Sequence, residues 1–163
     1  MGPSVIIGVM GGADHVSSQA LNAAESLGKL IAKEGWILLT GGRNLGIMDV
    51  ACRGAKEAGG LTLGILPDEK KFATSSYVDI PIYTGMGEAR NVINVLSSDV
   101  VVACPGASGT ISEVALALKS SKPVIAMGFD DKGLFSDMES RCYMHRAQTP
   151  EETITLIKKL LQD

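Results

Sequence analysis

The segment "VVACPGASGTISEVALALKSSKPVIAM", residues 101–127, decides the fold of this chain. Its apolar start and end predict two buried strands, and the stretch between them predicts a turn followed by a helix. Gly106, Gly109 and Thr110 lie in the turn. A glycine-rich junction between a strand and a helix presents unpaired backbone N–H groups at the positive end of the helix dipole. We therefore predict that this turn is an anion cradle that binds a phosphate-like group.

The same succession of strand, turn and helix repeats along the chain. Residues 5–10 and 36–40 are apolar runs that end in glycine pairs, and residues 17–35 between them have helical periodicity with a serine cap. The same reasoning predicts helices at 47–58 and 88–97, strands at 61–65, 79–83, 100–104 and 124–127, a loop at 67–76, and a last helix with a Thr149–Glu152 capping box and Pro150 at its first position. No element is assigned to residues 128–147.

This alternation of strands and helices is typical of α/β proteins. We therefore predict a single domain, residues 1–163, with a doubly wound, mainly parallel, Rossmann-like sheet that carries helices on both faces. An aliphatic core fits this fold, because 45% of the residues are hydrophobic but only 4% are aromatic.

Composition and charge limit the classes of partner. The chain has a net charge of −3 and no basic run, so nucleic acid is not expected to bind. The odd number and wide spacing of Cys52, Cys104 and Cys142 predict neither a disulfide framework nor a metal site. The N-terminal apolar run is too short for a signal peptide, and no later run reaches the ~18 residues of a membrane span. We expect a soluble cytoplasmic protein without a membrane partner.

Glycines gather where three of the predicted strands end. The three segments are "GVMGGAD" (8–14), "LTGGRNLGIMD" (39–49) and "ACPGASGTISE" (103–113). In open α/β sheets, ligands bind beyond the carboxyl ends of the strands, so these turns should meet at one binding edge. The residues predicted to bind the ligand are Gly11, Gly12, Gly41, Gly42, Arg43, Gly46, Arg90, Gly106, Ala107, Ser108, Gly109 and Thr110.

Common nucleotide motifs are missing from these turns. Gly41 and Gly46 have the spacing of a P-loop, but Ile47 and Met48 stand where that loop needs lysine and Ser/Thr, so an ATPase is not expected. No G-x-G-x-x-G follows the first strand, which gives a dinucleotide-dependent redox enzyme little support.

Two arginines at this edge indicate an anionic ligand. Arg43 lies inside the second glycine turn, and Arg90 is predicted in the first turn of its helix, where a cation opposes the helix dipole. A simpler alternative is that Arg90 is solvated or paired with Glu88.

Glu113 also has two interpretations. It is either a functional carboxylate or the second member of a Thr110–Glu113 capping box. The remaining candidates are expected to be structural: His15 and His145 as surface or loop histidines, and Met10, Met48, Met86 and Met127 as core residues.

Several motifs together resemble one superfamily. "PGASGTISE" resembles the P-G-G-x-G-T-x-x-E signature of the Lonely Guy nucleotide phosphoribohydrolases, which are also labelled lysine decarboxylase-like. "GGRNLGIMDVACRGAKEAGG" and "GEARNVINVLSSDVVVACPG" are similar to the second glycine loop and the arginine segment of that family. The resemblance implies that Arg90 and Glu113 occupy the positions of the catalytic arginine and glutamate. Three positions depart from the pattern: Ala107 replaces glycine, Ser112 an acidic residue, and Asn91 a lysine.

Within this superfamily the chain most resembles the molybdenum cofactor carrier proteins of algae and cyanobacteria. "GWILLTGGRNLGIM", "GAKEAGG", "VDIPIYTG" and "EVALALKSSKPV" carry this likeness. It implies a homodimer or homotetramer that binds, protects and delivers the molybdenum cofactor, with molybdoenzymes as delivery targets. Phosphate, sulfate or molybdate could then occupy the anion site. The alternative is a hydrolase that releases a base and ribose 5-phosphate from a nucleoside 5′-monophosphate, and only there would Arg90 and Glu113 be catalytic.

Overall fold

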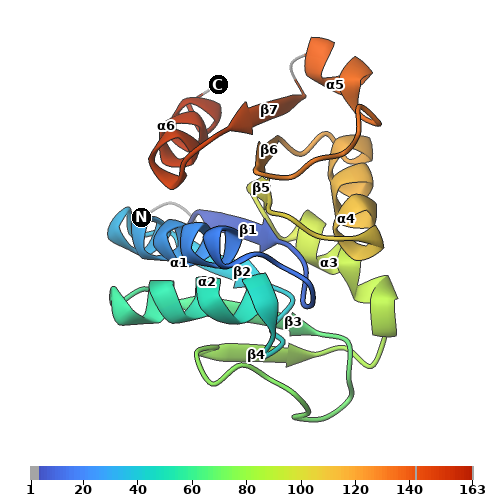
Figure 1. The fold of residues 1–163 in the computed structure, drawn as a ribbon. Coiled ribbons are helices and arrows are strands. Elements are labelled where there is room, and N and C mark those ends of the chain that lie inside the picture. Colours follow the sequence, from blue (N-terminus) through green and yellow to red (C-terminus); the bar gives the residue numbers. More distant parts are fainter. Residues whose placement is uncertain (1–3, 142, 163) are drawn as a thin grey trace.

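The computed structural model describes residues 4–141 and 143–162. Its strands β1 to β7 form one sheet (Figure 1). The strand order is β4-β3-β2-β1-β5-β6-β7, and every neighbouring pair is parallel. The strands are β1 (Ile6–Met10), β2 (Ile37–Thr40), β3 (Thr62–Leu66), β4 (Ile80–Tyr83), β5 (Val100–Ala103), β6 (Val124–Met127) and β7 (Met144–Ala147). The predicted α/β fold is confirmed, with a sheet that is parallel throughout rather than mainly parallel.

Helices cover both faces of the sheet, as expected (Figure 1). One face carries α1 (Ser18–Lys33), α2 (Gly46–Glu57) and α6 (Pro150–Leu160), and the other carries α3 (Asn91–Leu96) and α4 (Ser108–Lys119). Two short elements complete the chain: the 3₁₀ helix η1 (Gly87–Arg90), which runs into α3, and α5 (Ser136–Ser140) before β7. No helix in the described residues is long and apolar enough to cross a membrane.

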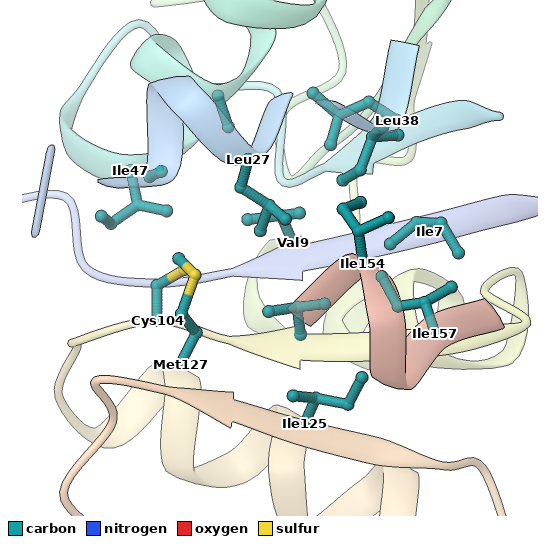
Figure 2. Packing of buried hydrophobic residues seen from close by; sticks show 14 of the residues in the cluster. Ile7, Val9, Leu27, Leu38, Ile47, Cys104, Ile125, Met127, Ile154 and Ile157 are labelled. Atoms are coloured by element: carbon teal, nitrogen blue, oxygen red, sulfur yellow. The ribbon is translucent and has the colours of Figure 1, made fainter. Parts of the chain in front are cut away.

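Each face of the sheet packs into its own apolar core. Ile7 and Val9 of β1 point toward α1, α2 and α6, whereas Met10 belongs to the core on the opposite face. Figure 2 shows the first of these cores, with Ile154 and Ile157 of α6 beside the sheet. β1, β2, β3, β5 and β6 are buried on both sides, so they have continuous rather than alternating apolar sequences, which made them recognisable.

Two helix ends follow the predicted capping chemistry. Ser17 Oγ accepts from the Ala20 N–H at 3.2 Å and begins α1. Thr149 Oγ1 accepts from the Glu152 N–H at 3.1 Å, and the Glu152 carboxylate accepts from the Gln148 N–H at 2.7 Å. The Thr149 cap and Pro150 at the start of α6 are therefore confirmed, but Glu152 closes the box on the N–H of Gln148 rather than on that of Thr149.

Helices α1 and α2 cross in backbone contact at two glycines. A Cβ added to Gly28 would lie 2.1 Å from the Ala51 carbonyl oxygen, and one added to Gly54 would lie 2.0 Å from that of Glu25. The two helices must separate to accept any side chain at either position. This close crossing brings the start of α2 over the end of β1, where the binding edge lies.

Replacing Gly54 by alanine is expected to lower the free energy of unfolding by about 1–3 kcal/mol, since the added methyl group overpacks this crossing. Gly109→Ala is a matched control, because Gly109 is also helical but nothing lies within 4 Å of an added Cβ. The control should be neutral or slightly stabilising, since alanine favours helix more than glycine does. Urea denaturation of both variants measures the difference, and equal midpoints would contradict the tight crossing.

Some local expectations were wrong. The unassigned stretch 128–147 contains α5 and β7, and His145 lies in β7, half-buried, with its Nε2 buried. Met86 is exposed rather than in the core. Residues 88–97 divide into η1 and α3 because the first turn is a 3₁₀ helix. Cys52 and Cys104 are buried free thiols, whereas Cys142 and residues 1–3 lie outside the described residues.

Candidate functional site

The candidate site lies where the direction of winding of the sheet reverses. β1 and β5 are neighbours, but β1 leads to α1 on one face and β5 leads to α4 on the other. Loops that diverge in this way leave a crevice between them, and ligands of open α/β sheets bind there. The Gly12 N–H donates to the Pro105 carbonyl at 2.9 Å and joins the two loops at the base of the crevice.

A cavity of about 210 Å³ opens at this crevice. All three predicted glycine turns contribute to its wall, together with η1 and the start of α3. The lining residues are Gly11, Gly12, Ala13, Gly41, Met48, Glu88, Arg90, Asn91, Ala107, Gly109, Thr110 and Glu113. The expectation that the three turns meet at one edge of the sheet is therefore confirmed.

Five predicted residues lie outside this wall, namely Gly42, Arg43, Gly46, Gly106 and Ser108. Gly42 and Gly46 have φ angles of 75° and 53°, a conformation that favours glycine, so they shape the turn instead of lining it. Gly46 also packs against the first turn, where an added Cβ would lie 2.2 Å from the Gly12 carbonyl oxygen. Gly106 lines an adjoining hollow.

Arg43 is directed toward the loop at 67–76. Its Nη1 pairs with the Asp68 carboxylate at 3.1 Å, and its guanidinium carbon lies 5.7 Å from the centre of the Phe72 ring. Burial is the main cause that lowers the pKa of Arg90; the charge of Arg43 lowers it further, whereas the charge of Asp68 acts in the opposite direction. Of the two predicted arginines, only Arg90 lines the cavity.

Arg90 is 7% exposed and is held by the sheet. It ends η1 rather than lying in the first turn of a long helix, and its Nη1 donates to the carbonyl oxygens of Gly41 at 2.7 Å and Ile65 at 2.6 Å. Its Nε is buried and has no partner among the described residues. The alternative of a solvated or Glu88-paired side chain is therefore wrong: two strand ends fix the guanidinium and leave a donor unused.

Glu113 lies in the same cavity wall and is likewise 7% exposed. Asn94 Nδ2 donates to its Oε1 at 2.8 Å. Burial raises the pKa of Glu113 to about 7, although the Asn94 hydrogen bond and the charge of Arg90 act in the opposite direction. A buried carboxyl group that titrates near neutrality in a cleft is typical of a functional site.

The capping interpretation of Glu113 is wrong. α4 begins at Ser108, so Thr110 already lies inside the helix, and no side chain caps its start at Ala107. The Glu113 carboxylate instead contacts Asn94 of α3. The first amide groups of α4 are thus left without a side-chain cap, and no atom lies within 4 Å of a Cβ built on Gly109. This helix start is open to an anion.

Two of the departures from the hydrolase signature contact each other. Asn91 Nδ2 donates to Ser112 Oγ at 3.1 Å, and Ser112 Oγ donates to the Gly109 carbonyl at 2.7 Å. The resemblance placed a lysine and an acidic residue at positions 91 and 112. Two neutral side chains that hydrogen-bond to each other therefore stand at these positions, and one of them, Asn91, lines the cavity.

A family model described as the SLOG cluster4 family matches residues 4–154. The chain belongs to the SLOG cluster4 family.

Solved structures of similar proteins place this SLOG cluster4 chain beside the molybdenum cofactor carriers. The molybdenum cofactor binding protein from Rippkaea orientalis is 52% identical, with a TM-score of 0.93 and coverage of 98% of both chains. The molybdenum cofactor carrier protein from Chlamydomonas reinhardtii is 47% identical, with a TM-score of 0.90 over 98% of this chain and 99% of that chain. The resemblance to molybdenum cofactor carrier proteins is confirmed.

The likeness to the hydrolases is more distant. The cytokinin riboside 5′-monophosphate phosphoribohydrolase of Mycobacterium tuberculosis is 27% identical over 105 residues, which cover 63% of this chain and 56% of that protein. This relative agrees with the superfamily resemblance carried by the "PGASGTISE" motif.

The predicted binding residues of this SLOG cluster4 chain did not include four residues of the cavity wall, namely Ala13, Met48, Glu88 and Asn91, or Asn94 behind it. Asn94 orients Glu113, and its Oδ1 is buried without a partner among the described residues. The sequence carries one signal for Asn94, because it is a buried polar residue among the apolar residues of the helix NVINVL. Among the described residues, no group of three or more His, Cys, Asp or Glu side chains could hold a metal ion.

Proposed function

We propose that this chain binds the molybdenum cofactor, a pterin with a phosphate and an oxo-molybdenum group, and that it protects the cofactor and delivers it to molybdoenzymes. The observation that carries the proposal is the near full-length similarity, at 47–52% identity, to solved structures named as cofactor carrier and cofactor binding proteins. The matched regions extend over 98–99% of this chain, so they are not limited to one motif.

The chemistry of the cavity supports an anionic ligand of this class. Arg90 has a buried, unused Nε–H, and the start of α4 at Ala107, Gly109 and Thr110 has no side-chain cap. Backbone N–H groups and one arginine are the donors that proteins use for phosphate and similar oxyanions. Gly11, Gly12 and Gly41 line the cavity, and a side chain at Gly41 would displace the Arg90 guanidinium. Phosphate, sulfate or molybdate would bind in the same cradle.

A retention experiment tests the proposal. Cofactor released from a molybdoenzyme under anaerobic conditions is mixed with the purified protein, which is then separated by gel filtration and assayed for molybdenum and oxidised pterin. We expect about one cofactor per chain and slower oxidative decay of the bound form. Protein that elutes without molybdenum, or that leaves the decay rate unchanged, would contradict the proposal. Arg90→Ala is the matched variant and should elute empty.

A nucleotide hydrolase is the second candidate, because Arg90 and Glu113 line the same cavity. Two observations oppose it. The neutral Asn91 and Ser112 stand where the resemblance placed a lysine and an acidic residue. In addition, a carboxyl group with a pKa of about 7 is partly protonated at neutral pH, whereas stabilising a ribosyl cation requires its ionised form.

We expect negligible release of free base from AMP and from N6-modified nucleoside monophosphates. Chromatography of the products after incubation with a panel of nucleotides measures this directly. Turnover above about 1 per second, in the ordinary range of enzymes, that is lost in Glu113→Gln would establish the hydrolase instead.

We also propose that the chain acts as a homodimer or homotetramer. Apolar side chains of β4 and α3, including Ile80, Ile82 and Leu96, are exposed in the single chain. An exposed apolar surface of this kind is typical of a protein interface. Light scattering should give a mass at least twice the 17.0 kDa of one chain, and a monomer at high micromolar concentration would contradict this.

A further inference from the structure

We infer that the binding site continues across the crevice into a second, uncharged hollow beside α1, which takes the flat heterocyclic end of an elongated ligand whose anionic end lies at Arg90. The inference rests on the proposed function and deepens it, because it assigns the two chemical parts of one ligand to two parts of the site.

The second hollow has a volume of about 260 Å³ and lies between the start of α1 and the end of β6. It is lined by Ser17, Gln19, Ala20, Ala23, Pro105, Met127, Gly128 and Gln148. None of these side chains carries a charge. The hollow therefore differs in kind from the cavity that holds Arg90 and Glu113.

A third hollow, of about 640 Å³, adjoins both of them. It shares Gly12, Ala13 and Ala107 with the Arg90 cavity, and Ser17 and Pro105 with the uncharged hollow. The three hollows therefore adjoin one another over the carboxyl ends of β1, β5 and β6, and together they are called the groove. An anion held at Arg90 alone would leave most of this groove unused.

The chemistry of the uncharged hollow fits a heterocycle with an amide edge. Gln19 and Gln148 each offer a carboxamide donor and acceptor, and neither side chain bonds to another residue in the described part of the chain. Ala20, Ala23 and Met127 provide apolar walls. Apolar walls with a few polar groups are typical of small-molecule sites. Pterins and purines both present a flat ring with such an edge.

The two ends of the groove are tested with separate probes. Binding of 6-hydroxymethylpterin is followed by its fluorescence, and binding of inorganic sulfate by calorimetry. In Gln19→Ala/Gln148→Ala we expect pterin binding to weaken about tenfold, as for the loss of two neutral hydrogen bonds, with sulfate binding unchanged. In Arg90→Ala we expect sulfate binding to weaken, with pterin binding unchanged. Gln162→Ala, an exposed glutamine after α6, is the matched control and should behave like the parent protein.

The outcomes separate this inference from the proposed function. Pterin binding that the double variant leaves unchanged, or that Arg90→Ala weakens equally, would overturn the two-part site. If the full cofactor is retained by the parent and equally by the double variant, the inference fails while the proposed function stands. A third outcome is that the parent does not retain the cofactor but binds AMP, and that the double variant binds AMP about tenfold more weakly. The proposed function then fails, while the hollow remains a heterocycle site.

Discussion

Arg90→Ala is expected to weaken sulfate binding about 100-fold. The guanidinium supplies a charge-assisted donor inside a buried cavity, and hydrogen bonds to charged groups contribute about 1.5–3 kcal/mol each. The donor is fixed in place by the carbonyl oxygens of Gly41 and Ile65, so the anion meets a preorganised group. Arg90→Lys should be intermediate, because an ammonium group keeps the charge but lacks the rigid planar fork.

Arg43→Ala is the matched control for this prediction. Arg43 comes from the neighbouring turn and pairs with Asp68, but it does not line the cavity. Its loss should change sulfate affinity less than about threefold, the effect of a screened, more distant charge. Calorimetric titration of the three variants measures both effects. Sulfate binding that Arg90→Ala leaves intact would remove Arg90 from the site, and equal losses in both arginine variants would mean that charge alone matters.

Glu113→Gln is expected to stabilise the protein above neutral pH. Burial raises the pKa of Glu113 from 4.5 to about 7, so the folded protein binds more protons than the unfolded chain between these values. The free energy of unfolding of the parent therefore falls as pH rises through this window. At pH 8 the variant should be more stable by roughly 2–3 kcal/mol, and at pH 4 the two should be equal.

The same substitution should remove the pH dependence of sulfate binding. Sulfate keeps its charge from pH 5 to 9, so any change in its affinity reports on the protein. An ionised Glu113 repels the anion, and the parent should bind sulfate less tightly above pH 7. Glutamine at position 113 can still accept from Asn94 and remains neutral, so its affinity should stay at the low-pH level.

Glu88→Gln is the control for the stability of Glu113→Gln, because it removes an exposed negative charge from the same cavity. Glu88→Gln should leave the free energy of unfolding at pH 8 within about 0.5 kcal/mol of the parent, as for most surface substitutions. Urea denaturation at pH 4 and pH 8 provides the comparison. If Glu113→Gln has the same free energy of unfolding as the parent at both pH values, burying the ionised Glu113 carboxylate does not destabilise the folded protein.

The fold was predictable because its signals are local. Each buried parallel strand is a short apolar run, and glycine follows several of them directly, as at Gly11 and Gly41. β7 was missed because its sequence, MHRA, is neither an apolar run nor an alternating one. Its burial depends on partners from elsewhere in the chain, including the Asp131 carboxylate, which accepts from Arg146 at 2.6 Å.

The site was only partly predictable, because its geometry depends on contacts between distant residues. Sequence spacing placed Arg90 near the binding edge, but it could not show that Gly41 and Ile65 hold the guanidinium. For Glu113, the local capping pattern competed with a contact to Asn94 in another helix, and the tertiary contact prevailed. Local motifs therefore indicate which residues lie at the site but not where their side chains point.

The central strand pair joins the two halves of the chain. Ile7 of β1 pairs with Val100 of β5, and the Gly12–Pro105 hydrogen bond extends this junction into the binding crevice. Contacts between such distant residues slow folding, because a long loop must close before they form. A ligand that touches both loops therefore binds only chains in which this closure is complete. By mass action the ligand adds RT ln(1 + [L]/Kd) to the free energy of unfolding, which is about 2.7 kcal/mol at a ligand concentration of 100 times Kd. The melting temperature should therefore rise with ligand concentration.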